Sequence, residues 1–212
     1  MSFRTRVKIC GITRVEDALA VSRHGVDAIG LVFYAKSPRN ITIEQAIEIC
    51  NALPAFVTVV ALFKDADEAF VHSVIDRVAI DLLQFHGVEK EDFCLKFGKP
   101  YIKAVGMVGQ QDVADFASGY PASRGLLLDS HAIGEDGGSG HVFDWGTIPE
   151  GSRGQITLAG GLNVENVAQA IAQVRPFAVD ISSGVESSGG IKDEALIKAF
   201  MNEVKRVDCE YE

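Results

Sequence analysis

The chain has 212 residues, a formal net charge of −9 at pH 7 and 47% apolar residues, values ordinary for a soluble globular protein. The negative charge argues against a general nucleic-acid-binding surface, and no signal-peptide-like start or membrane-length apolar run is present, so we expect a cytoplasmic protein. Scattered cysteines without a CxxC pair or a histidine at metal spacing disfavour a disulfide scaffold and a zinc module: Cys10, Cys50, Cys94 and Cys209.

Short β-branched, apolar runs alternate with segments of helical period along the chain. Such runs predict eight strands, over Val7–Ile12, Ala28–Phe33, Phe56–Phe63, Leu82–His86, Tyr101–Val105, Gly125–Asp129, Ile156–Ala159 and Ala178–Ser182. Helical segments between them are expected around Val15–Ser22, Ile43–Leu53 and Phe70–Val78, and over 90–97, 110–118, 163–174 and 193–206.

Local cap signals support four of these helices. We predict capping boxes at Thr13/Glu16 and Thr42/Gln45 and single caps at Asn163 and Asp193. Gly25 is the expected end of the first helix, because glycine readily adopts the left-handed conformation found there.

Strands that alternate with helices imply parallel pairing through right-handed crossovers. Eight such units over residues 1–212 predict one compact (β/α)8 TIM barrel. An open doubly wound sheet is the alternative, but it usually carries a glycine fingerprint after its first strand. Cys10-Gly11-Ile12-Thr13 is not such a fingerprint.

Barrel enzymes place their chemistry at the carboxyl ends of the strands. Cys10 ends the first predicted strand and Asp129 ends the sixth, so a thiol able to accept a proton and a carboxyl able to donate one share that end. Each has a plainer interpretation: many buried thiols are inert, and Asp is a common helix cap. The long loop from Ser130 to His141 after Asp129 is expected to be a lid or a disordered segment.

Small residues follow the last two predicted strands, where many barrels bind a phosphate. Gly160-Gly161 and Ser182-Ser183-Gly184 offer hydroxyls and closely approachable backbone N–H groups, and residues 184–190 are long enough for an extra helical turn. The same residues are also ordinary turn formers. Because such small residues follow both of the last two predicted strands, phosphate binding is favoured over the turn-forming interpretation.

Three further polar side chains have two interpretations each. Arg39, after the second strand, is suited to bind a carboxylate or phosphate, or is solvated. His86 is a candidate base or a structural hydrogen-bond donor. Lys8 shares a strand face with Cys10 and either lowers the thiol pKa or pairs with an interior carboxylate.

The segments around these residues resemble phosphoribosylanthranilate isomerase, a barrel enzyme family of tryptophan biosynthesis. They follow the predicted strand ends in order: VKICGIT (7–13), SPR (37–39), QFHG (84–87), LDS (128–130), GGSGHVFDW (137–145), LAGGL (158–162) and VDISSGVE (179–186). Phe85 and Ser139 stand where the family commonly has Leu and Thr, and neither bears on the expected chemistry.

This resemblance implies an Amadori rearrangement, an aldose–ketose isomerisation of N-(5-phosphoribosyl)anthranilate to 1-(2-carboxyphenylamino)-1-deoxyribulose 5-phosphate. In that scheme Asp129 is the general acid, Cys10 is the general base and Arg39 holds the anthranilate carboxylate, with no metal and no organic cofactor. The other implied substrate-binding residues include those at the phosphate: His86, Gly160, Gly161, Asp180, Ser182, Ser183 and Gly184.

Two other classes stay open. The first is another phosphosugar barrel enzyme. An indole-glycerol-phosphate synthase would be expected to carry a catalytic lysine on an early strand and an N-terminal extension. A ribulose-phosphate epimerase would be expected to carry metal-binding His and Asp at several strand ends. A non-catalytic phosphoribosyl-binding module would have lost Cys10 or Asp129, and both are present. The expected partner is a small phosphorylated substrate, with no nucleic acid and no membrane, in a monomer or a homodimer.

Overall fold

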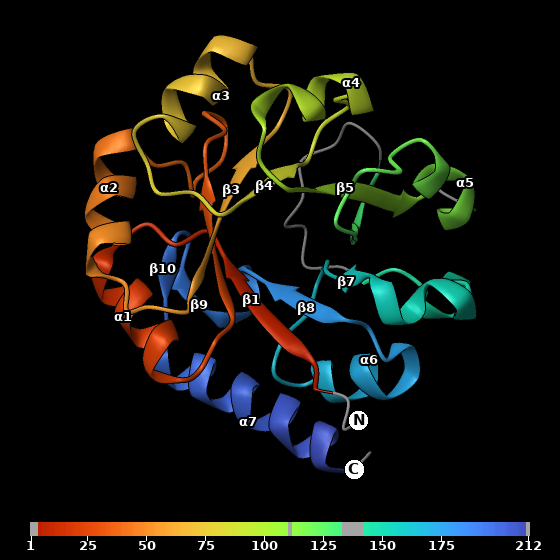
Figure 1. The fold of residues 1–212 in the computed structure, drawn as a ribbon. Coiled ribbons are helices and arrows are strands. Elements are labelled where there is room, and N and C mark those ends of the chain that lie inside the picture. The colour runs from red at the N-terminus through yellow and green to blue at the C-terminus, as the bar shows by residue number, and fades with distance from the viewer. Residues whose placement is uncertain (1–3, 110–111, 133–141, 211–212) are drawn as a thin grey trace.

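A computed structural model of the protein, which describes residues 4–109, 112–132 and 142–210, is a closed barrel of eight parallel strands (Figure 1). The strands are β1 Arg6–Cys10, β2 Ala28–Val32, β3 Thr58–Phe63, β4 Leu82–Phe85, β5 Tyr101–Val108, β6 Leu126–Ala132, β7 Thr157–Leu158 and β8 Ala178–Ile181. The barrel closes where β1 pairs with β8, in a register that sets Lys8 opposite Asp180. The predicted (β/α)8 fold is therefore confirmed.

Helices surround the barrel and connect successive strands (Figure 1). The α-helices are α1 Val15–Arg23, α2 Ile43–Ala52, α3 Glu68–Ile75, α4 Glu91–Cys94, α5 Val113–Ser118, α6 Val167–Val174 and α7 Glu194–Glu210. The 3-10 segments are η1 Leu95–Phe97, η2 Trp145–Thr147, η3 Glu150–Gln155 and η4 Ser183–Val185. A short hairpin of β9 Glu186–Ser188 and β10 Ile191–Lys192 follows η4, so the extra helical turn expected over 184–190 is wrong beyond Val185.

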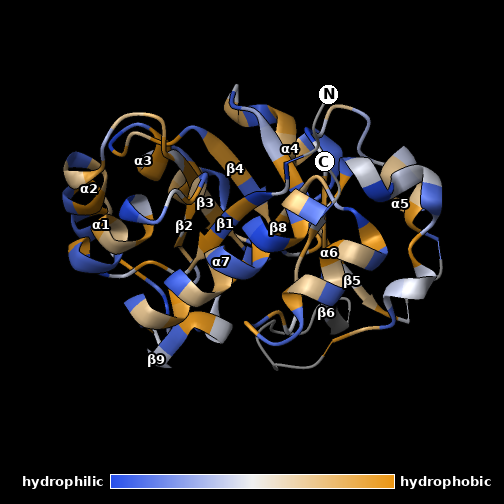
Figure 2. Ribbon diagram, turned by 90° about the horizontal axis from the view of Figure 1, so that it is seen from below, coloured by the Kyte–Doolittle hydropathy of each residue, from blue (hydrophilic) through white to orange (hydrophobic). Residues whose placement is uncertain are grey.

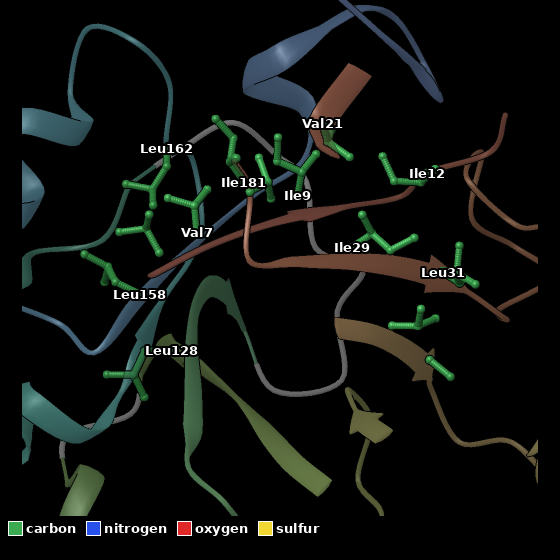
Figure 3. Close-up of a cluster of buried hydrophobic side chains, with 14 of the residues drawn as sticks. Val7, Ile9, Ile12, Val21, Ile29, Leu31, Leu128, Leu158, Leu162 and Ile181 are labelled. Atoms are coloured by element: carbon green, nitrogen blue, oxygen red, sulfur yellow. The ribbon is translucent and has the colours of Figure 1, made fainter. Parts of the chain in front are cut away.

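Two apolar layers follow from the alternation of side chains along each strand. The larger layer lies between the strands and the helices, and Figure 3 shows Val7 and Ile9 of β1 there with Ile29 of β2 and Val21 of α1. Figure 2 shows the complementary pattern, with apolar strands inside and helices whose hydrophilic residues lie outside. The smaller layer fills the barrel itself, as two clusters: Ile102, Ala104, Leu127 and Ala159, and Cys10, Val32 and Leu62.

Of the four predicted caps, those at Thr42/Gln45 and Asp193 are confirmed. Thr42 and Gln45 form a reciprocal capping box, and Asp193 accepts from two backbone N–H groups at the start of α7. Asn163 accepts from the N–H groups of residues 165 and 166, but the helix itself begins later, at Val167. The box predicted at Thr13/Glu16 is wrong, because α1 has no side-chain cap and the Thr13 hydroxyl donates instead to the Gly190 carbonyl at 2.5 Å.

Two predicted strand boundaries also need correction. The third strand begins at Thr58, and Phe56 lies outside it with a left-handed φ of 71° and a fully exposed side chain. The sixth strand does not end at Asp129 but continues to Ala132 beside a similarly long β5. Asp129 therefore lies within a strand, opposite Gly106 of β5, and the register of the two strands shifts just after this pair. Most of the predicted lid, from residue 133 to 141, lies outside the described residues.

Within the described part of the chain, no helix combines the length and the apolar character needed to cross a membrane.

Candidate active site

A cavity of about 290 Å³ opens at the carboxyl ends of the barrel strands. Residues from seven of the eight strands or the loops that follow them contribute to its wall, which is the position expected for a barrel active site. The lining residues that were singled out from the sequence are Cys10, Arg39, His86, Asp129, Gly160, Gly161, Asp180, Ser182 and Ser183. Of the predicted site residues only Gly184 is absent from this wall, because it packs against the Leu162 carbonyl.

Cys10 sits beside a buried ion pair at the bottom of this cavity. Lys8, two residues earlier on β1, donates to the Asp180 carboxylate of β8 at 2.8 Å, and both side chains are less than a tenth exposed. Lys8 thus pairs with an interior carboxylate, one of the two roles predicted for it. A Cβ on Gly30 would come within 2.6 Å of the Cys10 sulfur and 3.1 Å of the Lys8 nitrogen, so the two groups share the space that this glycine leaves open.

The electrostatic surroundings of Cys10 act in opposite directions. Burial raises the pKa of the thiol, the Lys8 ammonium lowers it, and the Asp180 carboxylate raises it again. Burial prevails, and the pKa lies above its ordinary value. The pKa of Lys8 is itself raised, because Asp180 and Cys10 outweigh the effect of burial. Cys10 is therefore a thiol in the free site, held next to a permanent cation that favours its thiolate.

Asp129 approaches the cavity from the opposite wall, on β6. His86, just after β4, places its Nε2 atom 3.6 Å from the Asp129 carboxylate, and its Nδ1 atom lies 3.0 Å from the side-chain amide of Gln84. The histidine and the carboxylate are 11% and 13% exposed, so substrate can still reach both. The structure thus brings His86 to Asp129 rather than to Cys10.

Arg39 lines the cavity, but its guanidinium is already paired. Its Nε and Nη2 atoms donate to the two carboxylate oxygens of Glu186, each at 2.8 Å, and Lys192 donates to the same carboxylate at 2.7 Å. Glu186 and Lys192 are cross-strand partners in the β9–β10 hairpin, where its two strands begin and end. These hydrogen bonds hold the pKa of Glu186 below its ordinary value although burial acts the other way. Two cations against one carboxylate leave a positive charge on this wall.

The small residues of the predicted phosphate site have the expected backbone. Gly160 and Gly161 both have left-handed φ values, 82° and 66°, and a Cβ on Gly160 would overlap the backbone of Ser130. Ser182 donates to the Cys10 carbonyl at 3.0 Å, and η4 begins at the next residue. This arrangement brings the two glycines and the two serines to one side of the cavity.

Some lining residues were given no role from the sequence. Lys36 and Lys64 follow β2 and β3 and add positive charge to the wall, and Lys64 lies over the ring of Tyr34. Their position after a strand was a usable signal, whereas the partnership of Glu186 with Arg39 joins residues 147 positions apart and has no local signature. In the described ranges, no three His, Cys, Asp or Glu side chains come together as metal ligands would.

Comparisons with known proteins agree along the whole chain. The family model for N-(5'phosphoribosyl)anthranilate (PRA) isomerase matches residues 7–203. The N-(5'-phosphoribosyl)anthranilate isomerase of Alcanivorax borkumensis is 53% identical over 207 residues, covering 94% of this chain and 95% of that protein.

Two solved structures are also similar. One is of monomers generated from the dimeric phosphoribosylanthranilate isomerase of Thermotoga maritima, with a TM-score of 0.81 and 39% identity, covering 95% of this chain and 99% of that one. The other is a phosphoribosyl anthranilate isomerase in complex with reduced 1-(o-carboxyphenylamino)-1-deoxyribulose 5-phosphate, with a TM-score of 0.80, 39% identity and the same coverage.

Proposed function

The chain belongs to the N-(5'-phosphoribosyl)anthranilate isomerase family and is an isomerase of tryptophan biosynthesis, and we propose that Cys10 and Asp129 divide its acid–base chemistry between them. The observation that carries this assignment is their shared cavity, entered by the thiol from β1 and by the carboxyl from β6. An aldose–ketose isomerisation needs an acid and a base at different atoms of the sugar.

The acid acts first in the proposed mechanism. Asp129 protonates the furanose ring oxygen, the C1′–O bond breaks, and the anthranilate nitrogen supplies the electron pair that forms an iminium ion. His86, 3.6 Å from Asp129, lies where it can hold the acid or the sugar in place. The position of Asp129 inside β6, opposite Gly106 of β5, fixes the backbone from which the carboxyl projects.

The base acts second. Cys10, as its thiolate, removes the C2′ proton, and the electrons move into the iminium to give an enolamine that tautomerises to the ketone. Lys8 favours this thiolate against the burial that raises the thiol pKa. The substrate's own iminium is the electron sink, so the proposal includes no cofactor.

The rest of the wall is proposed to bind the two anionic ends of the substrate. Gly160, Gly161, Ser182 and Ser183 hold the phosphate, with Gly184 shaping the turn behind them. Arg39 holds the anthranilate carboxylate through the N–H groups that Glu186 does not occupy, supported by the excess positive charge on that wall. Asp180, which lines the cavity and pairs with Lys8, is proposed to contact the substrate as well.

The test is a fluorescence assay of phosphoribosylanthranilate consumption by the wild type, Cys10→Ser and Asp129→Asn. Each substitution is expected to lower kcat by at least about a hundredfold, the usual scale of general acid–base catalysis. Thr147→Ala, in the described segment after β6 but away from the cavity, is the control and should keep wild-type kcat. Near-wild-type kcat in either variant would remove that residue from its role.

We further propose that the chain is a homodimer formed through the amino-terminal end of the barrel, opposite the cavity. Phe56 supports this, because its aromatic ring is fully exposed just before β3 and would be removed from water at such an interface. The Thermotoga maritima relative is described as dimeric. Sedimentation velocity should give a dimer for the wild type and a monomer of equal activity per site for Phe56→Glu, and a monomeric wild type would contradict the proposal.

Two expectations from the sequence join the proposal. Residues 1–212 are taken as one domain, since the first and last strands of the barrel pair with each other. The cytoplasmic location stays a prediction, consistent with a biosynthetic role.

A further inference from the structure

A buried lysine on the outer side of the barrel has no role in the site described above. Lys103 alternates along β5 with Ile102 and Ala104, whose side chains fill the barrel, so its own side chain points outward. It is 1% exposed, and burial lowers the pKa of its ammonium. A buried charge is destabilising unless it is matched, whereas a methionine would fill the same layer without a charge to match. Packing alone therefore does not explain why a cation is buried at this position.

The Lys103 ammonium holds the backbone on both sides of one active-site residue. Its Nζ atom donates to the carbonyl of Gly87 at 2.6 Å and to that of Phe85 at 3.2 Å. These carbonyls belong to the residues immediately before and after His86. The imidazole of His86 lies on the cavity side, 3.6 Å from Asp129. A cation outside the barrel thus fixes the peptide units from which an active-site imidazole projects.

Two carboxylates extend this contact to the neighbouring loop. Glu89 lies 3.3 Å from the Lys103 nitrogen and accepts from the backbone N–H groups of Asp65 at 2.7 Å and Gly87 at 2.9 Å. Asp65, in the left-handed conformation at φ 50°, accepts in turn from the N–H of Val88 at 2.7 Å. We call Asp65, Gly87, Glu89 and Lys103 the β3–β5 clasp.

The clasp is closely fitted at its centre. A Cβ on Gly87 would overlap the Asp65 carboxylate, so any other residue at this position would displace that carboxylate from its place. Asp65 and Gly87 directly follow Lys64 and His86, both of which line the cavity. The left-handed backbone at Asp65 is unfavourable for a residue with a side chain and persists when the surroundings require it.

We propose that the β3–β5 clasp positions His86 against Asp129, and that Lys103 is a positioning residue of the isomerisation. This inference rests on the proposed function, because it supposes that Asp129 is the acid whose surroundings His86 controls. Without the cation, the two carbonyls beside His86 lose their shared donor and the loop after β4 relaxes. The imidazole then leaves its place at the acid.

The test compares His86 in the wild type and in Lys103→Met by NMR, using the Cε1–H resonances of the five histidines at fixed pH. His86→Gln identifies the resonance. The described titratable and polar groups that line the same cavity include Gln84, Lys64, Asp129, Cys10, Lys36, Arg39 and Asp180, and all remain in the variant. We expect the His86 resonance and its titration midpoint to move while the other four histidines stay unchanged.

Kinetics supply the second readout. Lys103→Met is expected to lower kcat/KM about tenfold in the wild type and not at all in a His86→Gln background, since two residues that act as a unit are not additive. Val204→Ala, a buried truncation on α7 away from the clasp, is the control for lost stability and should leave the His86 resonance in place. Should Lys103→Met fail to fold, Lys103→Met/Glu89→Gln removes the uncompensated carboxylate and takes its place.

An unchanged His86 resonance in the folded variant, or equal losses in both backgrounds, would overturn the proposal. A failure of the proposed function is seen separately, as near-wild-type kcat in Asp129→Asn. The NMR result does not depend on turnover, so the two outcomes are distinguishable.

Discussion

The two walls of the cavity differ in the kind of charge that surrounds the reacting group. On the Cys10 wall, the neighbours are a lysine and a carboxylate that are buried, paired at 2.8 Å and held on adjacent strands. On the Asp129 wall, the neighbour is a histidine, whose ordinary pKa of about 6.5 lies within the working range of an enzyme. The ammonium beside the base therefore stays charged over the working range, since the pKa of Lys8 is raised, whereas the imidazole beside the acid can take up a proton.

This difference matches what each group must do. A buried thiol needs a permanent cation to become a thiolate, because burial alone raises its pKa. A carboxylic acid instead has to keep its proton until the ring oxygen of the substrate accepts it. A neutral imidazole beside the carboxyl does not favour the loss of that proton. The following predictions test whether the contrast between the two walls controls activity.

The largest effect is expected from removing the permanent cation. Lys8→Met takes away the charge that lowers the pKa of Cys10, so that pKa rises and the ascending limb of the kcat/KM profile, which follows the thiolate fraction, moves to higher pH. At pH 7 we expect a loss of about ten- to a hundredfold, since each pKa unit changes the thiolate fraction about tenfold. Activity should recover as the pH rises. A stopped assay of kcat/KM between pH 6 and pH 10 measures this shift.

The control for Lys8→Met addresses folding. Breaking a buried pair leaves Asp180 unmatched, at a cost of about 3–5 kcal/mol. Lys8→Met/Asp180→Asn removes that carboxylate, which itself raises the Cys10 pKa, so the ascending limb of the double variant should fall between those of the wild type and the single variant. A single variant with the wild-type profile would show that Lys8 does not act on the base.

A smaller effect is expected on the Asp129 wall. Below its own pKa, His86 becomes a cation that favours the Asp129 carboxylate and so removes the acid form that the first step needs. His86→Gln lacks this effect. At pH 7 we expect about a three- to tenfold lower kcat, but the variant should keep a larger share of its pH 7 activity at pH 5 than the wild type keeps. Equal ratios of the two activities in both proteins would mean that His86 does not control the acid.

The contrast between the walls was only partly visible in the sequence. Cys10 and Asp129 could be placed at one end of the barrel because strand periodicity is local and the fold then determines which ends meet. The charged partnerships were not predictable in the same way: Lys8 had two candidate roles, and the Arg39–Glu186 pair joins residues 147 positions apart. Periodicity shows which residues share a strand face but not which distant side chain completes a pair.

Local signals failed where a distant contact competes with them. The Thr42/Gln45 box formed because its partners lie within one turn, whereas the hydroxyl of Thr13 donates to a carbonyl 177 residues away and its predicted box is absent. Phe56 extended the apolar pattern of its strand, yet its backbone is left-handed and its ring is exposed. The length of β6 was underestimated because an aspartate normally marks a strand end, while here it lies inside one.

The smallest effect is expected from Glu186, and it tests whether this carboxylate adds a fixed charge to the Cys10 wall. Glu186 binds Arg39 and Lys192, and these contacts lower its pKa in the folded protein. The carboxylate thus contributes stability that is fully present above its ordinary pKa of about 4.5 and is lost as the pH falls through the lowered folded value.

Glu186→Gln should reduce the free energy of unfolding by about 1–3 kcal/mol at pH 7, the scale of hydrogen bonds to charged groups. Urea unfolding of both proteins at pH 7 and below pH 4 measures the difference, which should shrink at the lower pH. A difference that stays constant would mean that Glu186 contributes through packing rather than charge, and that the permanent charges of this wall end at Lys8 and Asp180.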